Sequence, residues 1–270
     1  MAFATSADGA RIYYETHGAG PGILFVHGSG GHHAAWWQQV PHLRDRYTVV
    51  TLDLRGFGRS DSEMDEFDSR RFPDDILAVL EASGVDRAVL VGQSIGAAAA
   101  LKAALRAPDR AAGVVVAHSL GGIDHPDLAA RVRADRAEAE KLPVLDRLLT
   151  PHFREVDPAR TFLFRQMGTF NAAKMADLRN LNTDGPTVEE VAASGIPICF
   201  LAGGRDAVLR PETVRAAAAL LPAATLELVA AGPHSMYWEV PALFNASLDR
   251  FLATVYSAEK PALSTSGAST

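Results

Sequence analysis

The 270-residue sequence is poor in cysteine, in clustered positive charge and in long apolar segments. Its single cysteine, Cys199, excludes an intrachain disulfide framework, and its place in the apolar run 196–202 predicts a buried, inert thiol. The formal net charge of −6, without any run of Lys or Arg, argues against nucleic acid as a partner. Because no apolar segment reaches the roughly 18–20 residues that span a bilayer, we expect no membrane association either.

The first residues also lack the features of a secretory signal, since residues 1–9 have no basic start and no long apolar stretch. We therefore expect a cytoplasmic protein. Hydrophobic residues make up 48% of the chain and charged residues 21%, as in globular proteins. A chain of this length can form one large α/β domain or two small ones.

Short apolar runs alternate with helical patterns along most of the chain. Apolar runs of this length suit strands that are covered on both faces, as in a parallel sheet. The expected strands are 3–5 and 11–16, which form a hairpin, and then 23–26, 47–52, 88–91, 113–117, 196–202 and 225–229. The expected helices are 34–46, 72–83, 97–107, 211–221 and 241–255. This alternation predicts an α/β fold with a mostly parallel, doubly wound sheet of about eight strands.

One long interval, residues 123–194, contains no clear strand. It shows helical patterns at 128–142, 160–167 and 172–181. We expect a helical cap inserted between the sixth and seventh strands, and the alternative is an ordinary pair of helices packed on the sheet. The core would then comprise residues 1–122 and 195–256. The tail 257–270 is rich in Ser, Thr, Ala and Pro, and it is expected to be disordered.

A pentapeptide at residues 92–96 (GQSIG) lies between an apolar run and a helix rich in small residues. A serine at such a strand-to-helix turn sits on a strained corner with its hydroxyl exposed, which makes Ser94 a candidate nucleophile. The pattern alone is common by chance. A second stretch, residues 117–121 (AHSLG), also follows an apolar run, but it lacks the first glycine, and no regular helix can start after it. Ser119 is therefore interpreted as a loop residue.

Two residues that could assist Ser94 follow later strands. Asp206 comes after the run 196–202, and His234 comes after the run 225–229. Loops that follow parallel strands gather at one edge of the sheet, so we expect all three side chains on the same rim. His234 would act as the base for Ser94, and Asp206 would orient its imidazole. The alternatives are an exposed turn for His234 and a helix cap for Asp206.

A glycine-rich turn at residues 27–31 (HGSGG) follows the strand 23–26 and opens a helix. Such a turn lets backbone N–H groups face a cavity, so the N–H groups of Ser29 and Ile95 are the candidate oxyanion hole. A tight connection without a catalytic role is the alternative. Ring-bearing residues near the expected rim are candidates for the substrate pocket, although core packing is the more common role of the aromatic ones. They are His32, Trp36, Tyr237 and Trp238.

Together these motifs resemble those of serine hydrolases with the α/β-hydrolase fold, from about residue 3 to residue 255. The matching segments are 27–31, 53–60 (DLRGFGRS), 92–96, 203–206 (GGRD), 232–235 (GPHS) and 238–241 (WEVP). The resemblance implies that Asp53 and Arg55 brace the pocket loop through a buried ion pair and backbone hydrogen bonds. Pro211 departs from the family pattern, because it comes one position late after Asp206. A shifted alignment would put Ala207 at the position of the acid.

The resemblance implies acyl transfer through an acyl-enzyme on a small carboxylic ester or lactone, with no metal and no cofactor. Hydrolysis of a C–C bond in ring-cleavage products is one alternative. It is disfavoured by Ser235, where those enzymes commonly have Trp, and by Gly31 and His32, where they usually have Pro. A weakly catalytic small-molecule receptor is another alternative. The expected partner is a small-molecule substrate, and the sequence leaves homo-oligomerisation open.

Overall fold

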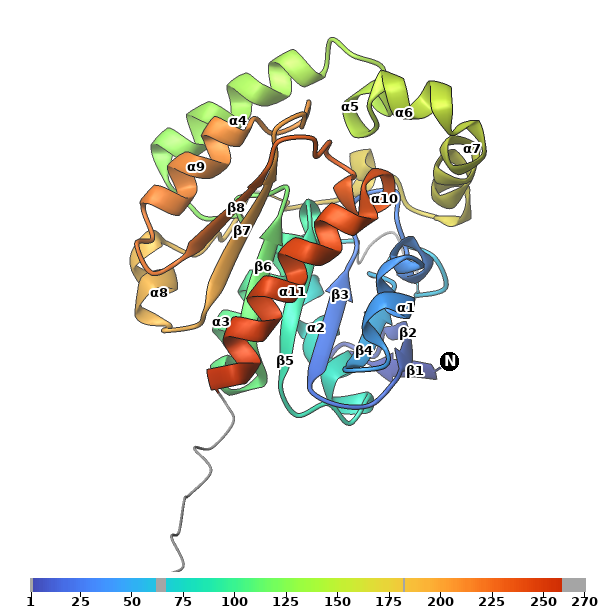
Figure 1. Cartoon of the computed structure of the whole chain (residues 1–270). Helices are drawn as coiled ribbons and strands as arrows, with labels where there is room; N and C mark the ends of the chain where they lie inside the picture. Colours follow the sequence, from blue (N-terminus) through green and yellow to red (C-terminus); the bar gives the residue numbers. More distant parts are fainter. Residues whose placement is uncertain (1, 62–66, 182, 259–270) are drawn as a thin grey trace, which may run out of the picture.

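One eight-stranded sheet forms the centre of the computed structural model, which describes residues 2–61, 67–181 and 183–258 (Figure 1). The strand order is β1-β2-β4-β3-β5-β6-β7-β8. The pairs β1–β2 and β2–β4 are antiparallel, and the remaining pairs are parallel. The strands are β1 (Ala2–Thr5), β2 (Arg11–His17), β3 (Gly22–Val26), β4 (Thr48–Leu52), β5 (Ala88–Gln93), β6 (Ala111–Ala117), β7 (Ile198–Gly203) and β8 (Thr225–Val229). The prediction of a mostly parallel sheet of eight strands is confirmed.

Helices cover both faces of the sheet. Side chains alternate between the faces along each strand, so each strand contributes to the apolar cluster on either side. On β3, for example, Leu24 and Val26 join one apolar cluster, and Ile23 and Phe25 join the other. Helices α2 (Phe72–Ala82), α3 (Ile95–Arg106) and α9 (Pro211–Ala219) contribute to the first cluster. The second cluster receives η1 (His33–Trp36), α1 (Gln39–Leu43), α10 (Met236–Glu239) and α11 (Pro241–Ala258). Apolar strands covered on both faces are what the sequence predicted.

The segment between β6 and β7 is helical, as expected. It contains α4 (Pro126–Ala139), α5 (Val144–Leu148), α6 (Pro151–Val156), α7 (Pro158–Met167) and α8 (Val188–Ala193). Helix α4 lies beside α9, whereas α5, α6 and α7 lie on the α10 side of the molecule (Figure 1). The segment therefore extends over the edge at which the parallel strands end.

The helix expected at residues 172–181 is wrong. Only a 3₁₀ turn, η6 (Met175–Asp177), forms there. The backbone of this segment bonds to distant loops instead of to itself: Ala173 N–H donates to Gly56 O at 2.9 Å, and Arg179 N–H donates to Phe67 O at 3.1 Å. These partners come from the loop that follows β4 and from the entry to α2, so tertiary contacts override the local helical pattern.

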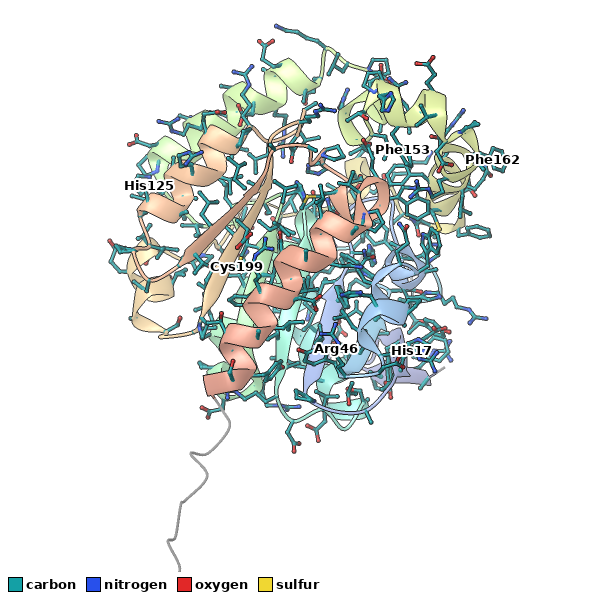
Figure 2. The ribbon with its side chains drawn as sticks, in the orientation of Figure 1. His17, Arg46, His125, Phe153, Phe162 and Cys199 are labelled. Carbon is teal, nitrogen blue, oxygen red and sulfur yellow. The ribbon has the colours of Figure 1, made fainter. Side chains whose placement is uncertain are left out.

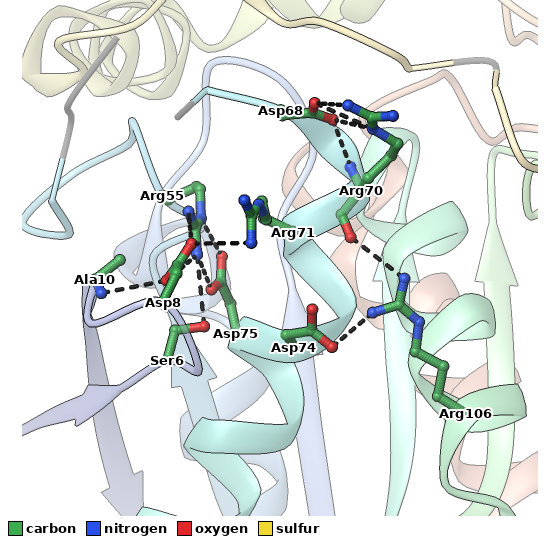
Figure 3. A network of polar contacts seen from close by, with 10 residues as sticks. All are labelled: Ser6, Asp8, Ala10, Arg55, Asp68, Arg70, Arg71, Asp74, Asp75 and Arg106. Carbon is green, nitrogen blue, oxygen red and sulfur yellow. Dashed lines mark hydrogen bonds and ion pairs between the residues drawn. The ribbon is translucent and has the colours of Figure 1, made fainter. Parts of the chain in front are cut away.

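A buried ion pair joins three parts of the core (Figure 3). Arg55 in the loop after β4 donates to Asp75 of α2 at 2.6 Å and to Asp8 of the β1–β2 turn at 2.7 Å. The resemblance implied an ion pair for Asp53 and Arg55, and the acidic partners of Arg55 prove to be Asp75 and Asp8. Asp53 contacts the side chain of His33, with 2.7 Å between Oδ1 and Nδ1, and it accepts the backbone N–H groups of His33 at 2.5 Å and of Arg59 at 2.8 Å. The network holds the loop beside the site.

Three smaller sequence features also have a place in the structure. Cys199 is buried on β7, and burial raises the pKa of its thiol to about 11, which fits an inert thiol (Figure 2). Helix α11 runs to Ala258, so residues 257 and 258 are helical and were wrongly assigned to a disordered tail; residues 259–270 lie outside the described residues. None of the described helices combines the length and the apolar character that crossing a membrane requires.

Candidate active site

Ser94 occupies the corner between β5 and α3, with φ of 54° and ψ of −118°. This φ lies in the left-handed region, which residues other than glycine rarely adopt. The flanking glycines are required by close packing. A Cβ on Gly92 would collide with Ala97 Cα, and a Cβ on Gly96 would collide with Val26 O. The sharp strand-to-helix turn predicted from the pentapeptide is therefore present, and Ser94 is held on it by the backbone.

Asp206 and His234 are in direct contact. His234 Nδ1 lies 2.9 Å from Asp206 Oδ2 and 3.0 Å from Oδ1. The carboxylate also accepts the backbone N–H groups of Val208 and Leu209 at 2.8 and 2.9 Å. With Nδ1 directed at the carboxylate, Nε2 is the nitrogen of His234 that remains for a nucleophile. Asp206 is thus the residue that contacts this histidine, although the late Pro211 allowed an alignment with Ala207 at this position.

A second histidine contacts the same carboxylate. His118 Nδ1 lies 3.0 Å from Asp206 Oδ2, and the two side chains are only 0% and 1% exposed. The sequence did not single out His118, because its partner Asp206 lies 88 residues further along the chain. The sequence signal was its position directly after the apolar run 113–117, and the structure adds a φ of 53°, nearly the same as that of Ser94.

The charges around Asp206 are set by burial and by these contacts. Burial by itself would raise the pKa of Asp206, but the charge of His234 and the hydrogen bonds from both histidines outweigh it, and the pKa is held well below its usual range. Burial lowers the pKa of His118. His118 is therefore neutral near pH 7 and donates through Nδ1, while its buried Nε2 has no hydrogen-bond partner among the described residues. Asp206 stays ionised and fixed in orientation.

Ser94 and His234 line the same cavity, which has a volume of about 520 Å³. Gln93 Nε2 donates to His234 O at 3.2 Å and so ties the two loops together. No hydrogen bond joins the Ser94 hydroxyl to His234 in the described part of the chain, and catalytic hydrogen bonds are often long before a substrate binds. The cavity wall is largely apolar. It includes Leu120, Ile123, Leu128, Val132, Leu181, Val208 and Leu209.

The two candidate oxyanion donors lie on different cavities. Ile95 lines the large cavity with Ser94, and as the first residue of α3 it has no acceptor for its N–H within the helix. Ser29 lines a second cavity, of about 310 Å³, together with Tyr237 and Trp238. Tyr237 and Trp238 are thus cavity-lining residues, although of the smaller cavity, and the role of Ser29 stays a prediction.

His32 and Trp36 line neither of these two cavities. Trp36 is completely buried, with its ring centroid 4.7 Å from that of Phe25 and 4.9 Å from that of Tyr237. His32 Nδ1 accepts the backbone N–H of Ala34 at 3.3 Å and caps η1. The observed contacts of Trp36 are those of core packing, and those of His32 are those of a helix cap.

Among the described residues, two groups of side chains have a geometry that could hold a metal ion. They are His32, His33 and Asp53, and His118, Asp206 and His234; within each group one potential ligand atom per residue lies within 4.8 Å of the others. In the second group both histidines direct Nδ1 at the carboxylate. A metal ion there would have to replace two N–H protons, so hydrogen bonding accounts for the arrangement without a metal.

Comparison with known proteins gives consistent results. A family model described as the alpha/beta hydrolase fold matches residues 21–241. The chain is 27% identical over 267 residues to the dihydrolipoyllysine-residue acetyltransferase component of the acetoin cleaving system of Cupriavidus necator, covering 91% of this chain and 67% of that protein. Est816, described as an N-acyl homoserine lactone degrading enzyme, has a TM-score of 0.75 and 26% identity, covering 92% of this chain and 99% of that one.

A thermophilic esterase of Thermogutta terrifontis also superimposes on the chain. Its TM-score is 0.78 at 24% identity, and the match covers 94% of this chain and 98% of that chain. At this identity the likeness concerns the fold alone. It establishes that the sheet, the covering helices and the helical segment after β6 are arranged as in known structures.

Proposed function

Because the chain belongs to the alpha/beta hydrolase fold family, we propose that it is a serine hydrolase of small carboxylic esters or lactones. One observation carries the proposal. Ser94, on its left-handed corner, lines the same cavity as His234, and the Nδ1 of His234 is bonded to the ionised Asp206. A nucleophile, a base and an orienting acid thus follow three different strands, in the chain order typical of the family.

The first half of the reaction acylates Ser94. His234 Nε2 accepts the hydroxyl proton, and Ser94 Oγ attacks the substrate carbonyl carbon. The resulting oxyanion is stabilised by the N–H groups of Ile95 and Ser29, each worth roughly 3–4 kcal/mol in such sites. When the tetrahedral intermediate collapses, the C–O bond to the alcohol breaks, and His234 returns its proton to the leaving oxygen.

The second half releases the acid. His234, neutral again, takes a proton from water, and the hydroxide oxygen attacks the acyl carbon. Collapse of this second intermediate breaks the bond to Ser94 Oγ, which recovers its proton from His234. In both halves Asp206 stabilises the imidazolium. His118 shares the Oδ2 atom of that carboxylate with His234, and we assign it the role of a positioning residue for Asp206.

The ester or lactone class is favoured over cleavage of C–C bonds by residues of the site itself. Ser235 follows His234, and its backbone N–H donates to Leu148 O at 3.0 Å, at the end of α5. Ser235 is buried, and it departs from the Trp that C–C bond hydrolases commonly have at this position. Est816 is described as degrading N-acyl homoserine lactones, and its likeness to this chain supports lactones as substrates to test.

Labelling with a fluorophosphonate probe, followed by peptide mapping, tests the nucleophile. We expect one modified residue, Ser94, and loss of labelling in S94A. The substrate class is then tested by steady-state kinetics on p-nitrophenyl acetate, on a panel of lactones and on a vinylogous diketone. Rapid multiple turnover of esters or lactones supports the proposal. Turnover of the diketone alone would assign the C–C bond class, and stoichiometric binding without turnover would assign a receptor.

A further inference from the structure

The wall that α4 contributes to the Ser94 cavity is positively charged. Arg133 and Arg136 both line this cavity. Residues three apart on a helix lie on the same face, so the two guanidinium groups are neighbours. Leu128 and Val132 line the same cavity from the same helix, so the charged pair lies beside apolar side chains.

Neither guanidinium is neutralised by a carboxylate of the protein. Other arginines are paired, as Arg106 is with Asp74 at 2.6 Å (Figure 3). Within the described residues, no carboxylate oxygen lies within 4.0 Å of Arg133 or Arg136. Asp135, which lies between them in the sequence, is buried. Its carboxylate accepts the backbone N–H of Arg210, the residue directly before α9, at 3.0 Å. It faces α9 and not the cavity.

The charges on the cavity wall do not cancel. Among the described residues that line it, Arg133 and Arg136 carry positive charge, and Asp124 carries the only negative charge. His118 is neutral near pH 7, because burial lowers its pKa. The residues that line the cavity therefore carry an excess of one positive charge, on two exposed arginine side chains beside an apolar surface.

We infer that the substrate carries a carboxylate, which Arg133 and Arg136 bind while the ester or lactone carbonyl lies at Ser94; this inference rests on the proposed function. A guanidinium group matches a carboxylate with two parallel hydrogen bonds. Two neighbouring guanidinium groups without carboxylate partners among the described residues favour an anionic group over a neutral one. The apolar residues that line the same cavity suit the hydrocarbon that would separate the two groups of the substrate.

The test compares two substrates that differ only in the distal charge: 4-nitrophenyl hydrogen glutarate and its neutral methyl ester. The wild-type protein should have a kcat/KM about tenfold higher for the acid, as expected of a hydrogen bond to a charged group. R133Q and R136Q should each raise KM for the acid about tenfold and leave the constants for the methyl ester nearly unchanged. Added salt should reduce the preference.

Arg131→Gln is the matched control, because Arg131 lies on the same helix, is exposed and does not line the cavity. It should leave the kinetics on both substrates unchanged. The inference is overturned if the wild type hydrolyses both substrates equally well, or if R133Q and R136Q affect both alike. Those results leave the proposed function intact, because the methyl ester still turns over. If neither ester turns over and the fluorophosphonate does not label Ser94, the proposed function fails, and the inference fails with it.

Discussion

The neighbouring strands β5 and β6 are each followed by a residue with almost the same positive φ. Ser94 has a φ of 54° after β5, and His118 has a φ of 53° after β6. The two corners then diverge. The first leads straight into α3, whereas the second leads into Gly121 and Gly122, which both have positive φ values and start no helix. The helix must fold back tightly at the first corner, which is why only that corner needs glycines on both sides of its central residue.

The corners also differ in what they do with the side chain that they hold. Both residues line the large cavity, but Ser94 is half-buried, whereas the side chain of His118 is completely buried and contacts Asp206. The same local strain thus directs one side chain toward solvent-accessible space and another into a hydrogen bond of the core. A left-handed corner at a strand end is therefore a positioning device, and the surrounding packing decides its chemical use.

Removing the serine hydroxyl that follows each strand should give the largest difference between the two corners. Ser94→Ala should lower kcat on an ester by about 10⁶-fold, because the nucleophile is lost. Ser119→Ala, the matched change after β6, should leave most of the activity. Steady-state kinetics with p-nitrophenyl acetate measures both, and similar losses in the two variants would remove the distinction between the corners.

The side chain of Asp206 contacts both His118, which follows β6, and His234. Asp206→Asn should reduce kcat about 10⁴-fold with little change in KM, because the amide no longer stabilises the correct imidazole tautomer or the imidazolium. Single-turnover and steady-state kinetics separate binding from chemistry. A rate like that of the wild type would move the acid role to another residue, with Asp124 as the next candidate.

His118 tests whether the buried corner matters for catalysis. His118→Leu removes the hydrogen bond to Asp206 and should lower kcat about tenfold, with KM unchanged. His118→Asn can donate an N–H from a similar position, and Asn tolerates a positive φ, so most of the rate should return. If His118 only filled space, the two variants would have equal rates, with any difference confined to their melting temperatures.

The flanking glycines test the tightness of the first corner. Gly92→Ala should lower the free energy of unfolding by about 1–3 kcal/mol, because the new methyl group meets the backbone of α3. Gly168→Ala is the control, since Gly168 has a φ of −67° and its added Cβ would meet its nearest neighbour at an ordinary 3.5 Å. Urea unfolding of both variants measures the difference, and equal stabilities would contradict the close approach.

The two corners should also differ in how stability depends on pH. Burial holds the pKa of His118 in the folded protein below its ordinary value of 6.5. Below pH 6.5 the unfolded chain therefore binds a proton that the folded protein excludes, and stability falls as the pH falls, by up to about 1.4 kcal/mol per pH unit. Above that pH the contribution is complete.

Urea unfolding at pH 7 and pH 5 measures this loss. His118→Asn should lose less stability between the two values than the wild type, and Ser94→Ala should lose as much as the wild type, because serine does not titrate in this range. His27 is common to all three proteins; its pKa is lowered to about 4 by burial, and it adds the same slope to each. Parallel curves for the wild type and His118→Asn would contradict the assignment of a neutral buried His118.

Much of this architecture is encoded locally. Apolar runs and glycines predict the strands, because each run must be buried on both faces. The rule that loops after parallel strands share one edge was enough to bring Asp206 to His234. The prediction of a helix at 172–181 was wrong, because the backbone of this segment bonds to loops that no local sequence pattern identifies. His118 was missed because its partner, Asp206, lies 88 residues further along the chain.

The sequence by itself determined the order of strands and helices, the glycine-flanked corner at Ser94 and the choice of Asp206 and His234. Only the tertiary structure decided that two histidines share one carboxylate, that Trp36 packs in the core and that Arg133 and Arg136 line the cavity of Ser94. The physical reason is the range of the forces involved. Periodicity and backbone strain act between near neighbours, whereas contacts of side chains from separate elements exist only after the sheet and its covering helices have packed together.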